Sequence, residues 1–285
     1  MLVCHDMIWR ARNHTIDLSQ RGLIMGILNA TPDSFSDGGL HHNGEGALRH
    51  AFQMIGEGAE IIDVGGESTR PGAPMVTAEE ELQRVIPVIR GLRASWDGLI
   101  SIDTAKALVA AQALEAGADI VNDVSGLRAD PEMIHVCQRS RCGVIVMHMQ
   151  GTPQTMQQCP TYEDVVGEVR SFFEERFATI TRAGVAAEQL CFDPGIGFGK
   201  TPEHNWILLE HLPDLMIHQR PLLLGVSRKS FIGHRLRDPD IGHRSWPTVA
   251  LTAFGREHGA MIHRVHEVKG NAQALRMTEA LLQSR

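Results

Sequence analysis

One local pattern repeats from Gly22 to the C-terminus: a short apolar, β-branched run is followed by a longer segment of helical period. Eight such runs predict strands at residues 23–28, 60–64, 99–102, 119–122, 143–147, 190–193, 221–226 and 260–265. The helical segments are expected to begin near Glu45, Thr77, Lys106, Asp130, Tyr162, Pro202, Arg244 and Asn271. Most of the runs are continuously apolar, which is typical of parallel strands buried on both faces.

Eight strand–helix units predict an α/β fold, and a single closed (β/α)8 TIM barrel fits this length better than an open sheet. A doubly wound sheet is the alternative. We assign the catalytic barrel to residues 22–285 and a short N-terminal extension to residues 1–21. The extension is expected to form a small hairpin that caps the bottom of the barrel.

Several helix ends carry local signals. Thr77 and Glu80 fit a capping box, in which each side chain bonds the other residue's backbone N–H. Four glycines fall where helices should stop, and glycine relieves the left-handed turn there. They are Gly58, Gly117, Gly184 and Gly259.

The composition excludes several classes of protein. Hydrophobic residues make up 43% of the 285 residues, too many for a disordered chain. No apolar run approaches the about 20 residues that span a bilayer, and the N-terminus has no signal-peptide core. The net charge of −7 disfavours nucleic acid as a partner. Five cysteines without a C-x-x-C pair are interpreted as free thiols, which predicts a cytoplasmic protein.

Unusual polar residues follow all eight predicted strands, at the end of a barrel where active sites lie. In strand order they are Asn29, then Asp63 and 67–70, Asp103, Asn122 and Asp123, His148, Asp193, 227–230, and Arg264 with His266. Single polar residues at strand ends can be structural caps, but their presence at every strand favours a functional mouth.

The basic residues come from the last two strands, where barrels often bind phosphate. They are Arg228, Lys229, Arg264 and His266. Guanidinium and ammonium groups suit a phosphate or pyrophosphate. Asn29 and Asp33 could hold Mg²⁺ against that group with oxygen ligands. The alternative for Arg228 and Lys229 is a solvated surface pair.

Acidic and amide side chains lie, by this prediction, on the other side of the mouth. Asp103, Asn122 and Asp193 could accept hydrogen bonds from a flat heterocycle with several N–H donors. The alternative is a structural ion pair with Lys229 or Arg264.

The glycine-rich segment 193–201 ends in G-K-T but is not a P-loop, because Pro194 stands where the first glycine belongs. We interpret it as a loop that approaches a flat ligand closely. Met147 and Phe198 could form apolar walls for that ligand, or could equally be core residues.

Two long loops follow the first two strands, at residues 31–39 and 65–72. Each combines turn formers with an apolar tip, Phe35 in one and Pro71 in the other. Such loops could be lids that exclude water, or plain surface turns.

Motifs at the strand ends resemble those of the dihydropteroate synthase family. They are MGILNATPDSFSDGG (25–39), IIDVGGESTRPGA (61–73), SIDTAK (101–106), NDVSG (122–126), VMHMQGTP (146–153), FDPGIGFGKTPEHN (192–205), GVSRKSFIG (225–233) and HRVHEVK (263–269). The resemblance runs from about residue 22 to the C-terminus. It implies a (β/α)8 barrel and a transferase in which 4-aminobenzoate displaces pyrophosphate from 6-hydroxymethyl-7,8-dihydropterin pyrophosphate, giving 7,8-dihydropteroate.

The resemblance also implies roles for individual residues. The pterin site maps onto Asp103, Asn122, Met147, Asp193, Phe198, Lys229 and Arg264. The pyrophosphate site maps onto Asn29, Thr69, Arg70, Arg264 and His266, with Mg²⁺ at Asn29. The aminobenzoate site maps onto Phe35, Ser68, Thr69, Pro71, Lys229 and Ser230. Catalysis is expected of Asp103, Lys229, Arg264 and Asp33.

The family further implies a homodimer, inhibition by sulfonamides, and small molecules rather than nucleic acid or membrane as partners. Residues 242–250 depart from the family pattern, which puts in doubt the local packing and the subunit contact. Two other functions stay open: a barrel methyltransferase acting on methyltetrahydrofolate, and a non-catalytic pterin-binding protein. The lid of residues 31–39 and the loop 227–230 argue against the first, and the presence of Asn29, Arg70 and His266 argues against the second.

Overall fold

The computed structural model describes residues 7–30, 39–68 and 75–284, with the side chains of the second segment described from residue 44. Eight parallel strands close into a barrel in the order β10-β3-β4-β5-β6-β7-β8-β9. They are β3 (Leu23–Asn29), β4 (Ile61–Gly65), β5 (Leu99–Asp103), β6 (Ile120–Asp123), β7 (Gly143–Met147), β8 (Leu190–Asp193), β9 (Leu222–Leu224) and β10 (Ala260–Val265). The predicted (β/α)8 barrel is confirmed, and the open doubly wound sheet is wrong.

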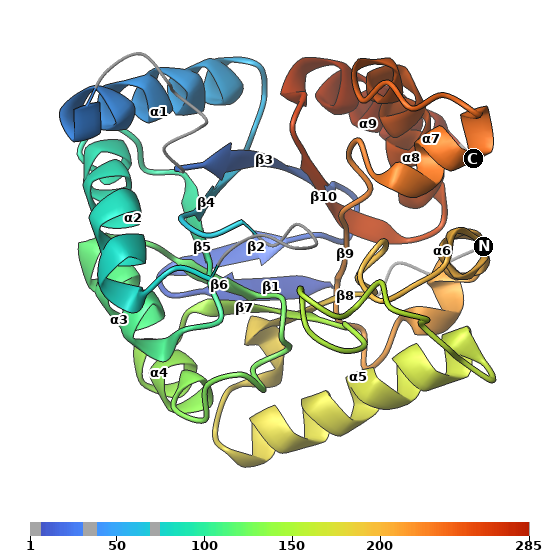
Figure 1. The fold of residues 1–285 in the computed structure, drawn as a ribbon, viewed down its shortest axis with the longest axis horizontal. Helices are drawn as coiled ribbons and strands as arrows, with labels where there is room; N and C mark the ends of the chain where they lie inside the picture. The colour runs from blue at the N-terminus through green and yellow to red at the C-terminus, as the bar shows by residue number, and fades with distance from the viewer. Residues whose placement is uncertain (1–6, 31–38, 69–74, 285) are drawn as a thin grey trace.

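Helices form a ring around the strands (Figure 1). They are α1 (Gly39–Gly56), α2 (Ala78–Arg93), α3 (Ala107–Ala116), α4 (Met133–Ser140), α5 (Val165–Arg182), α6 (Pro202–Glu210), α7 (Ser230–Leu236), α8 (Ser245–Glu257) and α9 (Val268–Gln283). Short 3₁₀ turns occupy Ala187–Gln189, Leu212–Leu215 and Gly242–Arg244. No helix in the described part of the chain is long and apolar enough to cross a membrane.

Several helix boundaries depart from the prediction, and α4 and α5 begin three residues after Asp130 and Tyr162. Helix α1 begins at Gly39, well before Glu45. Its start was not predicted because residues 39–44 include two glycines, which are poor helix formers. Helix α9 begins before Asn271, where the Glu267 side chain accepts from the backbone N–H of Gly270. Helix α7 was not predicted, since its seven residues are too few to reveal a period.

The predicted helix-end signals are present. The Thr77 hydroxyl accepts from the Glu80 backbone N–H at 3.2 Å, and the Glu80 carboxylate accepts from the Thr77 N–H at 3.3 Å. All four glycines adopt positive φ: Gly58 at 109°, Gly117 at 119°, Gly184 at 95° and Gly259 at 93°.

A two-stranded antiparallel hairpin, β1 (Ile8–Ala11) and β2 (His14–Asp17), closes one end of the barrel. Trp9 is fully buried, and its indole N–H donates to the carbonyl of Gln189, just before β8. A hairpin at this place was expected from the sequence. The division of the chain into an extension of residues 1–21 and a barrel of residues 22–285 stays a prediction.

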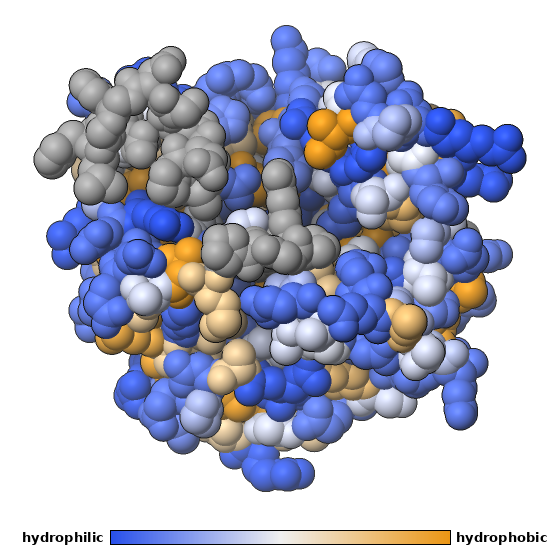
Figure 2. Space-filling view, viewed as in Figure 1, coloured by the Kyte–Doolittle hydropathy of each residue, from blue (hydrophilic) through white to orange (hydrophobic). Residues whose placement is uncertain are grey.

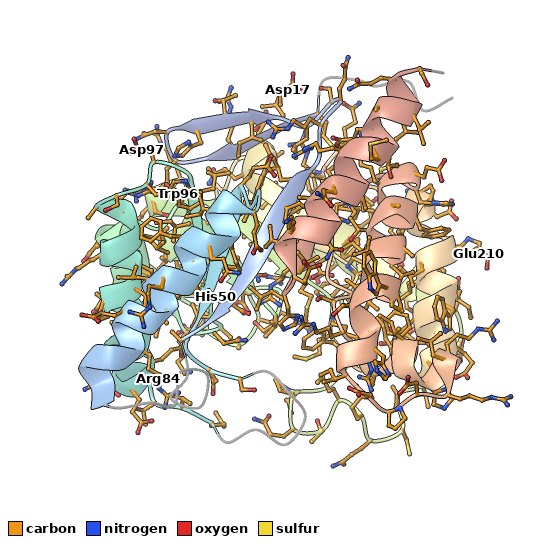
Figure 3. The ribbon with its side chains drawn as sticks, turned by 90° about the horizontal axis from the view of Figure 1, so that it is seen from above. Asp17, His50, Arg84, Trp96, Asp97 and Glu210 are labelled. Atoms are coloured by element: carbon orange, nitrogen blue, oxygen red, sulfur yellow. The ribbon has the colours of Figure 1, made fainter. Side chains whose placement is uncertain are left out.

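The two ends of the barrel can be compared in Figure 3. Asp17 on the hairpin and Asp97 before β5 lie at one end, whereas Arg84 lies toward the other. The Arg84 guanidinium donates to the carbonyl of Gly66, immediately after β4, at 2.8 Å. The carboxyl ends of the strands therefore open opposite the hairpin.

Apolar side chains form two separate cores. The larger one lies between the barrel and its helices. A smaller one fills the hairpin end of the barrel interior and includes Trp9, Ile61, Leu99, Ile120 and Ile262. Because side chains alternate along a strand, residues two and four positions further on also face the interior. The polar residues of the mouth lie above this apolar plug.

Candidate active site

Strand register brings the predicted acidic and amide residues together. Asn29 pairs with Gly65, Gly65 with Asp103, and Asp103 with Asn122, so these residues form one row at the mouth. Asp193 pairs with Met147 on the far side of the barrel. The next row that faces the interior lies two residues earlier on each strand, and there Ile27 pairs with Asp63 and Asp63 with Ser101. The mouth therefore presents carboxylates and amides from several strands.

An arginine from the closing strand joins two of these carboxylates. Arg264 donates from Nε to Asp63 Oδ2 and from a terminal nitrogen to Asp103 Oδ2, each at 2.6 Å. The expectation that the acids lie across the mouth from the basic residues is therefore wrong for Arg264. The physical reason is reach: an arginine side chain spans the narrow interior from β10 to β5. The ion pair that was the alternative for Asp103 is present.

Burial sets the protonation behaviour of this cluster. Desolvation raises the pKa of Asp103 to about 7, although Arg264 opposes the rise. For Arg264, desolvation acts to lower the pKa, but the charges of Asp63 and Asp103 outweigh it and raise the pKa above its ordinary value. The site thus holds a fixed cation beside a carboxyl group that titrates near neutral pH.

Asn122 on β6 and Asp193 on β8 are buried at the ends of two strands that flank β7. The Asn122 amide nitrogen donates to Asp63 Oδ2 at 3.1 Å. Asp193 Oδ1 accepts from the backbone N–H of Gly195 at 2.7 Å. Desolvation raises the Asp193 pKa despite the nearby charge of Lys229. One oxygen of Asp193 therefore stabilises the turn at Gly195, and its other oxygen, Oδ2, is available to a ligand.

Lys229 reaches into the site from the turn before α7. Its ammonium lies 4.6 Å from the centroid of the Phe198 ring and donates to the carbonyl of Ile196. Burial lowers the Lys229 pKa to about 8, although Asp193 favours its charged form. Lys229 is thus not part of a solvated surface pair. The Nε of Arg228 is also buried.

Apolar residues of the mouth form a cluster separate from both cores. Met147 packs with Val124, Met149 and Met156, and Phe198 lies against them. This arrangement gives one wall of the mouth an apolar, polarizable surface suited to a flat ring. It favours the wall role of Met147 and Phe198 over the core role.

A buried lysine holds the glycine-rich loop in place. The Lys200 ammonium lies 3.0 Å from His148 Nδ1 and donates to the carbonyl of Phe198 at 3.0 Å. Desolvation lowers the pKa of Lys200 to about 7 and that of His148 to about 2. His148 was expected at a strand end and Lys200 in the glycine-rich loop, but their contact was not predicted, because the two residues are distant in sequence.

The anion side of the mouth involves His266 and Ser227. The backbone N–H of His266 donates to Ser227 Oγ at 3.1 Å, and His266 Nδ1 lies 2.9 Å from the same oxygen. This contact ties the end of β10 to the loop after β9. It leaves Nε2 as the ring nitrogen not engaged with Ser227.

The remaining predicted residues divide in two. Asp33, Phe35, Thr69, Arg70 and Pro71 lie outside the described residues. Ser68 follows β4, and Ser230 is exposed at the first position of α7. A recess of about 630 Å³ beside the mouth is lined by Ser68 and Asp103 among others. Hydrophilic side chains predominate on the face that surrounds the mouth in Figure 2.

Comparison with known proteins identifies the class. The family described as pterin binding enzyme matches residues 25–266, so the chain belongs to that family. Within it, the chain groups with the dihydropteroate synthases. It is 49% identical to a dihydropteroate synthase of Synechocystis sp. over 265 residues, which cover 93% of this chain and 92% of the relative. The chain is accordingly an enzyme of the transferase type.

Solved structures agree with this placement. A Yersinia pestis dihydropteroate synthase in complex with a sulfonamide drug is 44% identical and superimposes with a TM-score of 0.91 over 97% of this chain and all of that one. A Xanthomonas albilineans dihydropteroate synthase with 4-aminobenzoic acid is 41% identical, with a TM-score of 0.91 over 98% and 99% of the two chains.

Proposed function

We propose that this chain condenses 6-hydroxymethyl-7,8-dihydropterin pyrophosphate with 4-aminobenzoate to form 7,8-dihydropteroate and pyrophosphate. The observation that carries the proposal is the mouth of the barrel. There Asn122 and Asp193 are buried near the apolar cluster of Met147 and Phe198. Lys229 lies over the Phe198 ring, and Arg264 donates to Asp103. Buried acceptors suit the N–H edge of a pterin, and the cations suit its leaving group.

The pterin site is built to hold a flat ring in one orientation. Asn122 and Asp193 accept from ring N–H groups, and Met147 and Phe198 pack on the ring face. Asp103 supports the positive charge that grows on the pterin methylene as the C–O bond to pyrophosphate lengthens. This favours a loose, cation-like substitution. The neutral aniline nitrogen of aminobenzoate then attacks without needing a strong base.

The leaving group is held at the closing strand. Arg264 on β10 and His266 directly after it, with Lys229 from the turn before α7, supply positive charge and donors for pyrophosphate. Asn29 ends the adjacent strand β3, and its amide oxygen is the kind of ligand that binds Mg²⁺. Mg²⁺ usually takes one or two protein ligands plus phosphate oxygens, so Asn29 with the substrate fits the ion. When bound, Mg²⁺ would neutralise charge on the departing pyrophosphate.

The aminobenzoate site is proposed at Ser68, Lys229 and Ser230, together with Phe35, Thr69 and Pro71. The complexes of relatives with 4-aminobenzoic acid and with a sulfonamide drug support this ligand class and inhibition by sulfonamides. Arg70 and Thr69 are proposed to contact pyrophosphate, and Asp33 to act in catalysis.

A direct assay tests the function and the metal together. The protein is incubated with dihydropterin pyrophosphate, radiolabelled 4-aminobenzoate and Mg²⁺, and labelled dihydropteroate is measured. We expect product formation that collapses in excess chelator and returns when Mg²⁺ is restored. Absence of product would contradict the function, and full activity in chelator would contradict the metal.

We also propose a cytoplasmic homodimer. Ile241, Trp246 and Leu236 lie on or between α7 and α8 and expose 53%, 80% and 50% of their surface, an unusual density of large apolar side chains. Cys137, Cys142 and Cys191 are buried free thiols, in keeping with a reducing compartment.

The dimer has its own test. Trp246→Lys should shift the sedimentation coefficient from that of a dimer toward that of a monomer, because the charge opposes burial of this face. The exposed Met277 on α9 provides a control: Met277→Lys should leave the dimer intact. A wild-type protein that sediments as a monomer would contradict the proposal.

A further inference from the structure

Asp63 is a fully buried charged residue of the mouth, yet the proposed reaction gives it no task. It lies on β4 with no exposed surface, one row below Asp103 and Asn122. Its row partner across β5 is Ser101. A carboxylate so far from solvent costs free energy unless its partners compensate for the lost hydration.

Both hydrogen bonds to Asp63 come from residues of the proposed pterin site. Asp63 Oδ2 accepts from Asn122 Nδ2 at 3.1 Å and from Arg264 Nε at 2.6 Å. The same arginine reaches Asp103. One buried oxygen thus connects β4 with β6 and β10 directly, and with β5 through the guanidinium.

The bond to Asn122 decides which way the amide faces. A carboxylate oxygen can only accept, so the NH₂ group of Asn122 must turn toward Asp63. The amide oxygen of Asn122 then points away from Asp63. A ring N–H of a pterin requires an acceptor at that position, and an amide rotated by half a turn would present a second donor instead.

We propose that Asp63 is a positioning residue for pterin binding. It fixes the amide of Asn122 with its oxygen toward the ligand and holds Arg264 beside Asp103, without touching the substrate itself. This inference rests on the proposed function, because it takes the ligand of Asn122 to be a pterin.

The test compares two variants in the same row. Asp63→Asn keeps the shape of the side chain but replaces an obligate acceptor with a group that can also donate. Ser101→Ala is the matched control, since Ser101 is buried, faces the same interior and has no hydrogen-bond partner among the described residues. Dihydropteroate affinity is measured by calorimetry, and KM is measured for each substrate.

For Asp63→Asn we expect dihydropteroate affinity to fall about tenfold to a hundredfold, the range for a hydrogen bond to a charged group. The KM for dihydropterin pyrophosphate should rise, and the KM for aminobenzoate should stay within about twofold of wild type. Ser101→Ala should match the wild type in all three. A general loss of stability would change the KM for both substrates. A positioning role changes only the KM for dihydropterin pyrophosphate.

A double-mutant cycle tests whether Asp63 acts through Asn122. In Asp63→Asn/Asn122→Ala, the loss of affinity should be smaller than the sum of the losses in the two single variants. Additive losses, or wild-type affinity in Asp63→Asn, would overturn the inference. A wild-type protein that makes no dihydropteroate would instead overturn the proposed function.

If Asp63→Asn does not fold, the wild-type protein still decides the question. In protein labelled with ¹⁵N at asparagine, one proton of the side-chain amide signal that disappears in Asn122→Ala should exchange slowly with water, since that proton is hydrogen-bonded to Asp63. Fast exchange of both protons of that amide would overturn the inference.

Discussion

At the scale of the residue, burial determines how the carboxyl groups of the mouth behave. Asp103 has a pKa of about 7 because the loss of hydration outweighs the attraction of Arg264. Its charge is therefore present above that pKa and is lost as the pH falls through it. The proposed cation-like path depends on this charge, so the rate should depend on pH in the neutral range.

We expect kcat/KM for dihydropterin pyrophosphate to fall as the pH drops below about 7, since kcat/KM reports groups of the free enzyme. Asp103→Asn should lower kcat/KM at high pH and remove this inflection. The check is a pH–rate profile of both proteins. A wild-type profile that stays flat through the pKa of Asp103 would contradict the assignment.

Asp193 provides a second prediction at this scale. Asp193→Asn should weaken pterin binding by about 1–3 kcal/mol, because a ring N–H loses a buried acceptor. The measurement is calorimetric titration with dihydropteroate. Unchanged affinity would remove Asp193 from the pterin site.

The sequence located most residues of the mouth but not their partners. Periodicity shows that Asp63, Asp103 and Arg264 stand at strand ends, and the (β/α)8 closure brings those ends together. It does not show that one arginine bridges the interior to two carboxylates, since side-chain reach depends on the width of the barrel. The contact between Lys200 and His148 was missed for a related reason: it joins two side chains that are distant in sequence.

At the scale of the element, local signals predicted the strands and helix ends well. Strands Gly143–Met147, Leu190–Asp193 and Ala260–Val265 have the predicted bounds. In the first two, a continuous apolar run ends at or just before a polar residue. Helix α7 escaped prediction because seven residues make about two turns. Its position matters, since it follows the turn that carries Lys229.

The capping box of α2 gives a prediction at this scale. Thr77→Ala should lower the free energy of unfolding by about 1 kcal/mol, because the backbone N–H of Glu80 loses its acceptor. Urea denaturation should show a lower midpoint with an unchanged slope. An unchanged midpoint would mean that the cap adds no stability.

At the scale of the whole molecule, two buried histidines tie stability to pH. Desolvation lowers the pKa of His148 to about 2 and that of His263 to about 3, both below the ordinary value of 6.5. The unfolded chain therefore binds these protons first as the pH falls. Above pH 6.5 both histidines are neutral in the folded and the unfolded chain, and they do not reduce the free energy of unfolding. As the pH falls from 6.5 toward the folded pKa values, only the unfolded chain takes up these protons, so the free energy of unfolding declines.

His263→Leu should flatten that decline. His263 is 1% exposed, and neither ring nitrogen has a partner among the described residues. Below the ordinary histidine pKa, the free energy of unfolding should fall as the pH is lowered in both proteins. The fall per pH unit should be about 1.4 kcal/mol smaller in the variant than in the wild type. Equal slopes in urea titrations across this range would contradict the buried, neutral state of His263.

The central claim is that acceptors at the mouth hold the pterin while the closing strand holds the diphosphate. A crystal structure with dihydropteroate and pyrophosphate bound tests it most directly. We predict the pterin ring within hydrogen-bond distance of Asn122 and Asp193, and the pyrophosphate against Arg264 and His266. A pterin or a pyrophosphate bound elsewhere on the barrel would contradict the account.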